Sequence, residues 1–184
     1  QVISKDQVVD LSTYINDIDK SQYFEGLFNN AGNQDGKLYG LPSGVYQKIM
    51  YFNKDIFDQK GIPYPSSDWD NPITLEQLTD ISKKLSEGKG ADRKFGYFSD
   101  FDIYMIGAMA GESIYSSDGT TQLTDNHKKV FELYNQMINI DHSMPTPVDT
   151  KIMGGMDMFR AGKVAMIYDG TWWHQSAREI KEFN

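Results

Sequence analysis

Two aspartates, Asp100 and Asp102, flank Phe101 and are the best-spaced residues of this chain for acid–base chemistry. Two carboxyl groups near an aromatic ring can serve as general acid and base on a sugar. Asp102 also precedes a predicted helix at 103–110 and is a natural N-cap, while Asp100 suits a turn. Either carboxylate could instead hydrogen-bond a ligand. The spacing leaves capping, ligand binding and catalysis open.

Two adjacent tryptophans, Trp172 and Trp173, follow an apolar run at 164–168 and the residues Asp169-Gly170-Thr171. This order predicts a buried strand, a tight turn and a helix that starts at residue 171. Ligands of open α/β sheets lie beyond the carboxyl ends of the strands. An indole at this position is therefore suited to stack on a sugar ring. Only one of two adjacent helical residues is expected to face a cleft; we favour Trp172 for the cleft and Trp173 for the core.

Composition and missing motifs exclude several functions. The formal net charge of -8, without a basic stripe, argues against nucleic acid or an anionic membrane surface as a partner. The absence of cysteine excludes disulfides, thiolate zinc sites and a cysteine nucleophile. The three histidines lack metal-ligand spacing, and no G-x-S-x-G or phosphate-binding glycine motif occurs. We expect no metal, no cofactor and no membrane insertion by this segment, since no apolar run approaches the roughly 20 residues of a span.

Apolar periodicity and capping signals predict alternating strands and helices, which is typical of the α/β class. The best-marked helix start is Thr74, which has Gln77 at capping-box spacing. The predicted helices cover residues 7–19, 21–31, 53–61, 74–88, 103–110, 124–141, 153–161 and 171–184. The predicted strands or extended pieces cover residues 37–42, 47–52, 95–98, 113–115 and 164–168. In this arrangement, strand ends position both the aspartates and the tryptophans.

Four segments, in this order and at these separations, resemble the extracellular solute-binding proteins of ABC sugar importers, the family that includes maltose-binding protein. The segments are Gly36-Lys37-Leu38-Tyr39-Gly40-Leu41-Pro42; Met50-Tyr51-Phe52-Asn53-Lys54-Asp55-Ile56-Phe57 with Gly61-Ile62-Pro63; Asp68-Trp69-Asp70 before the Thr74 helix; and Phe159-x-x-Gly162-Lys163-x-Ala165-Met166-x-x-x-Gly170-x-Trp172. They cover most of the chain from residue 36 onward. The resemblance implies a lobe of the periplasmic-binding-protein type II fold, with three αβα layers, truncated relative to full-length members.

The resemblance also implies site residues. Trp172 falls on the family's aromatic platform, and Tyr46, four residues after Pro42, falls on a position where a member can place a ligand contact. Phe101 falls on the aromatic at a strand-to-helix turn, with the neighbouring aspartates as hydrogen-bond candidates. A carboxylate sometimes seen near the Tyr46 position is replaced here. The ligand-binding candidates are Trp172, Tyr46, Phe101, Asp100, Asp102 and Trp173.

The resemblance further implies that residues 1–45 are a remnant of a first lobe with the approach to the hinge, and that residues 46–184 form most of a second lobe. The function implied is to bind a carbohydrate, in particular an oligosaccharide, and to deliver it to the permease subunits of an ABC transporter, without catalysing a reaction. The expected state is a monomer in the periplasm or a lipoprotein at the cell surface, with the signal segment not present in this chain. The alternatives are a carbohydrate-active hydrolase that uses Asp100 and Asp102, and an interaction domain with buried aromatics.

Overall fold

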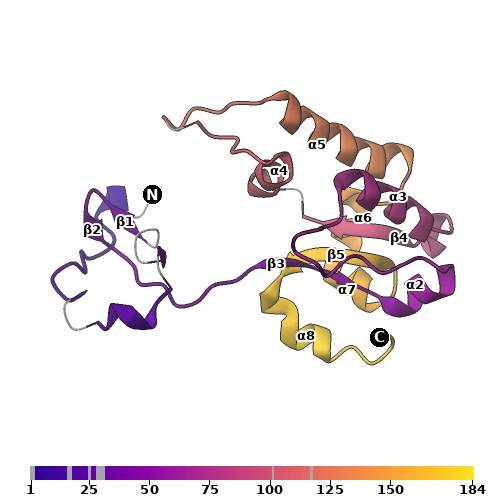
Figure 1. The fold of residues 1–184 in the computed structure, drawn as a ribbon, viewed down its shortest axis with the longest axis horizontal. Helices are drawn as coiled ribbons and strands as arrows, with labels where there is room; N and C mark the ends of the chain where they lie inside the picture. Colours follow the sequence, from indigo (N-terminus) through magenta and orange to yellow (C-terminus); the bar gives the residue numbers. More distant parts are fainter. Residues whose placement is uncertain (1–2, 16–17, 25, 28–31, 101, 117) are drawn as a thin grey trace. The chain divides into compact units, whose positions relative to one another are not determined.

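The computed structural model describes residues 3–15, 18–24, 26–27, 32–100, 102–116 and 118–184. Contacts between residues divide the chain into two compact units, Gln1–Tyr46 and Gln47–Asn184 (Figure 1).

The first unit contains short elements. Two 3-10 helices, η1 (Ile3–Lys5) and η3 (Lys20–Gln22), precede a hairpin of β1 (Asn33–Gln34) and β2 (Lys37–Leu38). Asp35 and Gly36 join the two strands with φ angles of 52° and 74°, both in the left-handed region that a tight type I′ hairpin turn requires. Leu38 is buried, and its carbonyl accepts a hydrogen bond of 2.6 Å from the Leu11 amide.

The helix predicted over 7–19 is wrong for the described residues, which form no α-helix there. Within 21–31, residues 21–22 belong to a 3-10 turn, and residues 25 and 28–31 lie outside the described residues. Aspartate side chains explain the difference: Asp10 accepts from the Ser12 amide at 2.9 Å, and Asp19 accepts from the Ser21 amide at 3.0 Å. Such local side-chain acceptors compete with helical hydrogen bonds.

The second unit is built on a three-stranded sheet in the order β3-β5-β4. Its strands are β3 (Lys48–Phe52), β4 (Phe95–Ser99) and β5 (Val164–Gly170), which confirms the strands predicted at 47–52, 95–98 and 164–168. β4 runs parallel to β5, and β3 runs antiparallel to it. The start of β3 and the ends of β4 and β5 therefore meet at one end of the sheet, which we call the carboxyl end; the opposite end is the amino end.

Helices cover both faces of this sheet, which confirms the predicted α/β class. In Figure 1, α3, α4 and α5 lie on one side of the sheet and α7 and α8 on the other. The helices of this unit are α2 (Lys54–Lys60), α3 (Leu75–Leu85), η4 (Gly90–Asp92), α4 (Ile103–Ala110), α5 (Asp125–Asn135), the π-helical η5 (Gln136–Ile140), α6 (Pro147–Ile152), α7 (Gly155–Arg160), η6 (Thr171–Trp173) and α8 (His174–Arg178).

Local capping sets the ends of these helices as the sequence predicts. Thr74 and Gln77 form a reciprocal capping box at the start of α3. The Asn53 side chain accepts from the Ile56 amide at 3.1 Å to start α2. Gly61 ends α2 in the left-handed conformation, at a φ of 63°.

The core lies around the middle strand. Val164, Met166 and Ile167 of β5 are fully buried, as is Phe57 of α2. Burying a large apolar side chain stabilises a fold by about 1.5–3 kcal/mol, so each of these residues contributes substantially to the core. The rest of the buried cluster comes from the helices, from β4 and β5 and from two loop positions: Leu78, Leu85, Phe95, Tyr97, Phe98, Ile106, Ile114, Val130, Tyr134, Met137, Met144, Met156, Met158, Phe159 and Ala165.

Three predictions are wrong or incomplete in this unit. The helix predicted over 171–184 ends at Arg178, because the residues beyond it pack on the core; the Phe159 and Phe183 rings meet edge-on with centroids 5.4 Å apart. The strand predicted at 113–115 is reduced to a single bridge between Tyr115 and Thr121. The short helix α6 was not predicted at all.

Candidate functional site

The carboxyl end of the sheet gathers several predicted site residues. Asp100 and Asp102 follow β4, and Trp172 and Trp173 follow β5. The strand register aligns these segments, since Ser99 lies opposite Tyr168 and Lys48 lies opposite Gly170. Thr171 extends the pairing, because its amide donates to the Gln47 carbonyl at 2.8 Å.

Trp172 has an indole that is 52% exposed and lies directly over Gly170. A Cβ atom on Gly170 would lie 2.2 Å from the indole Cζ3, so only glycine leaves room for the ring in this position. Residues directly opposite on paired strands present their side chains to the same face. The indole over Gly170 and the Lys48 side chain therefore lie on one face of the sheet.

Trp173 lies differently from its neighbour. It is partly buried and packs against the core cluster of the second unit. Of the two adjacent tryptophans, Trp172 thus presents the larger surface to a ligand.

Asp102 has two structural partners. Its carboxylate accepts from the Met105 amide at 2.8 Å as the N-cap of α4, and it forms an ion pair of 2.8 Å with the Lys48 Nζ. Burial by itself raises the pKa of Asp102, but the hydrogen bonds from Lys48 and Met105 outweigh burial, and the pKa lies below its usual value. The observed cap confirms the capping use of Asp102.

Lys48 is a site residue that the sequence analysis missed. The hydrogen bond to Asp102 raises the pKa of the Lys48 ammonium, and the charges of Asp100 and Asp169 act in the same direction. Both side chains of the ion pair remain about one-third exposed, so their oxygen and nitrogen atoms are within reach of solvent. A cation and carboxylates beside an exposed indole form a surface that suits neutral polyhydroxyl ligands, which need both donors and acceptors.

A second pair supports the segment that carries Trp172. The Tyr51 hydroxyl donates to the Gly170 carbonyl at 3.1 Å and lies 3.0 Å from the His174 Nδ1. Burial, followed by the charge of Asp169, raises the pKa of the Tyr51 phenol. These contacts link the end of β5 to the start of α8, so hydrogen-bonded residues lie on both sides of Trp172 in the chain. Neither Tyr51 nor His174 was predicted for the site.

The two remaining predicted ligand contacts are Tyr46 and Phe101. Tyr46 is the last residue of the first unit, and its side chain is 65% exposed. Phe101 lies outside the described residues.

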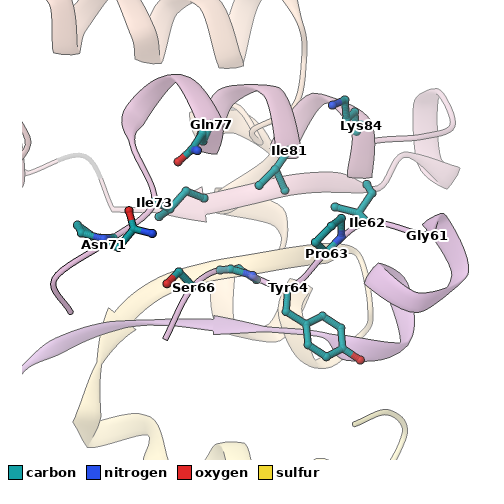
Figure 2. A pocket seen from close by; sticks show the side chains of 12 residues that line it. Gly61, Ile62, Pro63, Tyr64, Ser66, Asn71, Ile73, Gln77, Ile81 and Lys84 are labelled. Carbon is teal, nitrogen blue, oxygen red and sulfur yellow. The ribbon is translucent and has the colours of Figure 1, made fainter. Parts of the chain in front are cut away.

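A separate cavity of about 450 Å³ lies between the loop at 61–66 and α3 (Figure 2). Two of its polar side chains already have partners in the protein: the Gln77 side chain accepts from the Thr74 amide at 2.9 Å, and Lys84 pairs with Asp80 at 2.5 Å. Most of the remaining lining is apolar, with Ile62, Pro63, Ile73 and Ile81 among its residues. This cavity lacks the Lys48, Asp102 and Trp172 groups and is not the candidate site.

Within the described ranges, no cluster of histidine, cysteine, aspartate or glutamate has the arrangement of a metal site. The search of the same residues for helices long and apolar enough to cross a membrane found none.

Comparisons with known proteins define the class. The family model for bacterial extracellular solute-binding proteins matches residues 1–184, and the chain belongs to that family. A binding protein of Brucella abortus (strain 2308) is 32% identical over 178 residues, covering 94% of this chain and 41% of the relative. The galactooligosaccharide-binding protein of Bacillus subtilis (strain 168) is 29% identical over 165 residues, covering 80% of this chain and 36% of the relative.

A solved structure shows the same fold. The ABC substrate-binding protein of Listeria monocytogenes in complex with cycloalternan superposes with a TM-score of 0.83 at 25% identity, covering 99% of this chain and 47% of that chain. This match confirms the predicted periplasmic-binding-protein fold. The chain spans less than half the length of these three proteins.

Proposed function

We propose that this chain contributes a carbohydrate-binding wall to the solute-binding component of an ABC sugar importer. The observation that carries the proposal is the half-exposed Trp172 indole, fixed over Gly170 at the carboxyl end of the sheet, on the same face as Lys48. An aromatic face next to charged donors and acceptors matches the alternating apolar and hydroxyl surfaces of a sugar. The named relatives include an oligosaccharide-binding protein, which supports an oligosaccharide as ligand.

In this proposal residues 46–184 form most of a second lobe, and residues 1–45 are a remnant of a first lobe with the approach to the hinge. The division of contacts after Tyr46 supports such a boundary. Tyr46 and Phe101 remain proposed ligand contacts beside Trp172, Asp100, Asp102 and Trp173. The intact protein acts as a monomer outside the cytoplasm, in agreement with the extracellular description of the family, and delivers its sugar to membrane permease subunits.

The proposed protein is a carrier and has no catalytic step. Asp102 is an ionised carboxylate that is held by a helix cap and by Lys48, and its lowered pKa does not suit a general acid, which must be protonated to act. Turnover of an oligosaccharide that disappears in Asp100→Asn or Asp102→Asn would establish the hydrolase alternative instead.

Titration calorimetry against gluco-, galacto- and manno-oligosaccharides tests the proposal. We expect one oligosaccharide class to bind, and Trp172→Ala to weaken its binding at least tenfold, or about 1.4 kcal/mol. Trp69→Ala is the matched control, because Trp69 is a second exposed indole, 85% exposed, in the loop between α2 and α3 and outside the segments that follow β4 and β5. Absence of binding across the whole panel would refute the sugar assignment, and equal losses in the two variants would refute the platform role of Trp172.

A further inference from the structure

A cavity of about 530 Å³ lies at the amino end of the sheet, away from the proposed sugar site. Phe95, the first residue of β4, and Lys163, which precedes β5, both line it. Its volume falls within the range of about 300–1,000 Å³ that small-molecule sites occupy. The apolar part of the lining is formed by Phe95, Ile138, Met144, Ile152, Met153 and Met158.

Arg93 is the unusual group in this lining. One of its terminal nitrogens donates to the His142 carbonyl at 2.9 Å, and its Cζ lies 6.0 Å from the centroid of the Phe95 ring. Its Nε is buried and has no hydrogen-bond partner among the described residues. Buried guanidinium N–H groups normally have an acceptor, so this unsatisfied Nε, on a residue that lines the cavity, is a donor that a small turn of the Arg93 side chain would offer to a ligand.

The charges around the cavity favour an anion as that ligand. Lys163 donates one N–H to the Ala91 carbonyl at 3.0 Å and has further donors on the same ammonium. The lining contains one carboxylate, Asp149, whose Oδ2 accepts from the amide and the hydroxyl of Thr146 at 2.8 and 2.6 Å. The His142 ring contacts the Ile138 carbonyl through Nδ1 at 3.1 Å, which makes Nδ1 a donor. The lining therefore contains two basic side chains, Arg93 and Lys163, and one carboxylate.

We propose that this cavity binds a small monocarboxylate with an unbranched apolar chain. Arg93 and Lys163 hold the carboxylate, and a small turn of the Arg93 side chain brings its buried Nε to the ligand in the forked geometry that guanidinium groups form with carboxylates. The chain of the ligand lies against Met144, Met153 and Met158, whose flexible side chains adapt to irregular apolar shapes. The site is independent of the proposed carbohydrate function, because none of its lining residues belongs to the carboxyl end of the sheet.

Sodium octanoate, used below its micellar concentration, is the probe. We expect it to shift the methionine methyl resonances of Met144, Met153 and Met158 saturably in NMR spectra of isotope-labelled protein. Acetate and octylammonium should leave these resonances in place, since the first lacks the chain and the second has the opposite charge. Octan-1-ol should bind at least tenfold more weakly than octanoate. Equal binding of octanol and octanoate, or no saturable shift with octanoate, would overturn the proposal.

Variants give a second test on the same spectra. Arg93→Gln should weaken octanoate binding at least tenfold, and Arg93→Lys should weaken it less, because the charge remains while the fork is lost. Lys89→Gln is the matched control, since it removes one positive charge from an exposed residue outside the lining. Unchanged octanoate affinity in a folded Arg93→Gln variant would overturn the assignment of Arg93. Comparison of octanoate with octylammonium on the unmodified protein keeps the test decisive even where Arg93→Gln unfolds.

Discussion

The two ends of the β3-β5-β4 sheet use glycine for opposite purposes. At the amino end, Gly96 brings β4 against α3: a Cβ atom there would lie 1.9 Å from the Ser82 carbonyl oxygen. At the carboxyl end, Gly170 makes room for the Trp172 indole, which stays half exposed. Gly96 allows a close backbone contact inside the core, and Gly170 leaves room for a side chain at the surface. The comparison separates residues needed for the fold from residues needed for the site.

The largest effect is expected at the amino end, from Gly96→Ala. The added methyl group meets backbone atoms of α3, which cannot move without shifting the helix, and overpacking of this kind costs about 1–3 kcal/mol or more. We expect the upper end of that range, measured as the free energy of unfolding in urea. Gly154→Ala is the control, because its Cβ would come no closer than 3.7 Å to the nearest atom, a carboxylate oxygen of Asp157. Equal losses in the two variants would show that β4 and α3 are not in this close contact.

An intermediate effect is expected at the carboxyl end, from Gly170→Ala. The φ of Gly170 is -79°, which alanine adopts without strain, so the methyl group acts by displacing the indole. We expect about a tenfold loss of oligosaccharide affinity, or about 1.4 kcal/mol, with a smaller loss of folding stability than in Gly96→Ala.

Tryptophan fluorescence of the unliganded Gly170→Ala protein reports the displacement separately from binding. A changed emission spectrum with unchanged sugar affinity would show that the position of the indole does not matter to the ligand. An unchanged spectrum would show that the ring is not held over Gly170.

Much of the second unit could be predicted because its signals are local. The capping pair Thr74 and Gln77, the terminal glycine Gly61 and the apolar run of β5 each depend on residues within a few positions of one another. The start of α6 carries a similar local signal: Thr146 caps it, Pro147 occupies its first turn and Asp149 closes a capping box. The first unit was mispredicted where Asp10 and Asp19 bind nearby amides in place of helical carbonyls.

The candidate site was less predictable because its contacts join distant segments. Trp172 and Asp102 are suggested by the strand-end pattern, but the partner of Asp102 is Lys48, 54 positions away along the chain. Tyr51 and His174 are 123 positions apart and meet only because β3 pairs with β5. A lysine at the start of a strand gives no local sign of such a pairing. Register, which sets these contacts, depends on the packed sheet as a whole.

The smallest effect is expected from the charge of Glu87 at the amino end. The backbone of Glu87 forms an isolated β-bridge with Lys94, and its carboxylate forms ion pairs with Lys60 and Lys94. Hydrogen bonds from these lysines lower the pKa of Glu87 from 4.5 to about 2. A carboxylate whose pKa is lower in the folded state stabilises the fold above its unfolded pKa, and this contribution is lost as the pH falls through the folded value. Because the side chains are substantially exposed, solvent screening limits the contribution to about 0.5 kcal/mol.

Glu87→Gln should therefore lower the free energy of unfolding at pH 7 by about 0.5 kcal/mol, and the difference from the unmodified protein should shrink between pH 4.5 and about 2. Urea unfolding across this pH range measures it, with Glu179→Gln, at an exposed position outside the bridge, as the control. A difference that stayed constant down to pH 2 would mean that Glu87 acts through packing of its side chain, because a charge effect must vanish once the carboxylate is protonated. Gly96 stabilises the amino end of the sheet by allowing a close contact between backbones, whereas Glu87 stabilises it only while its carboxylate is ionised.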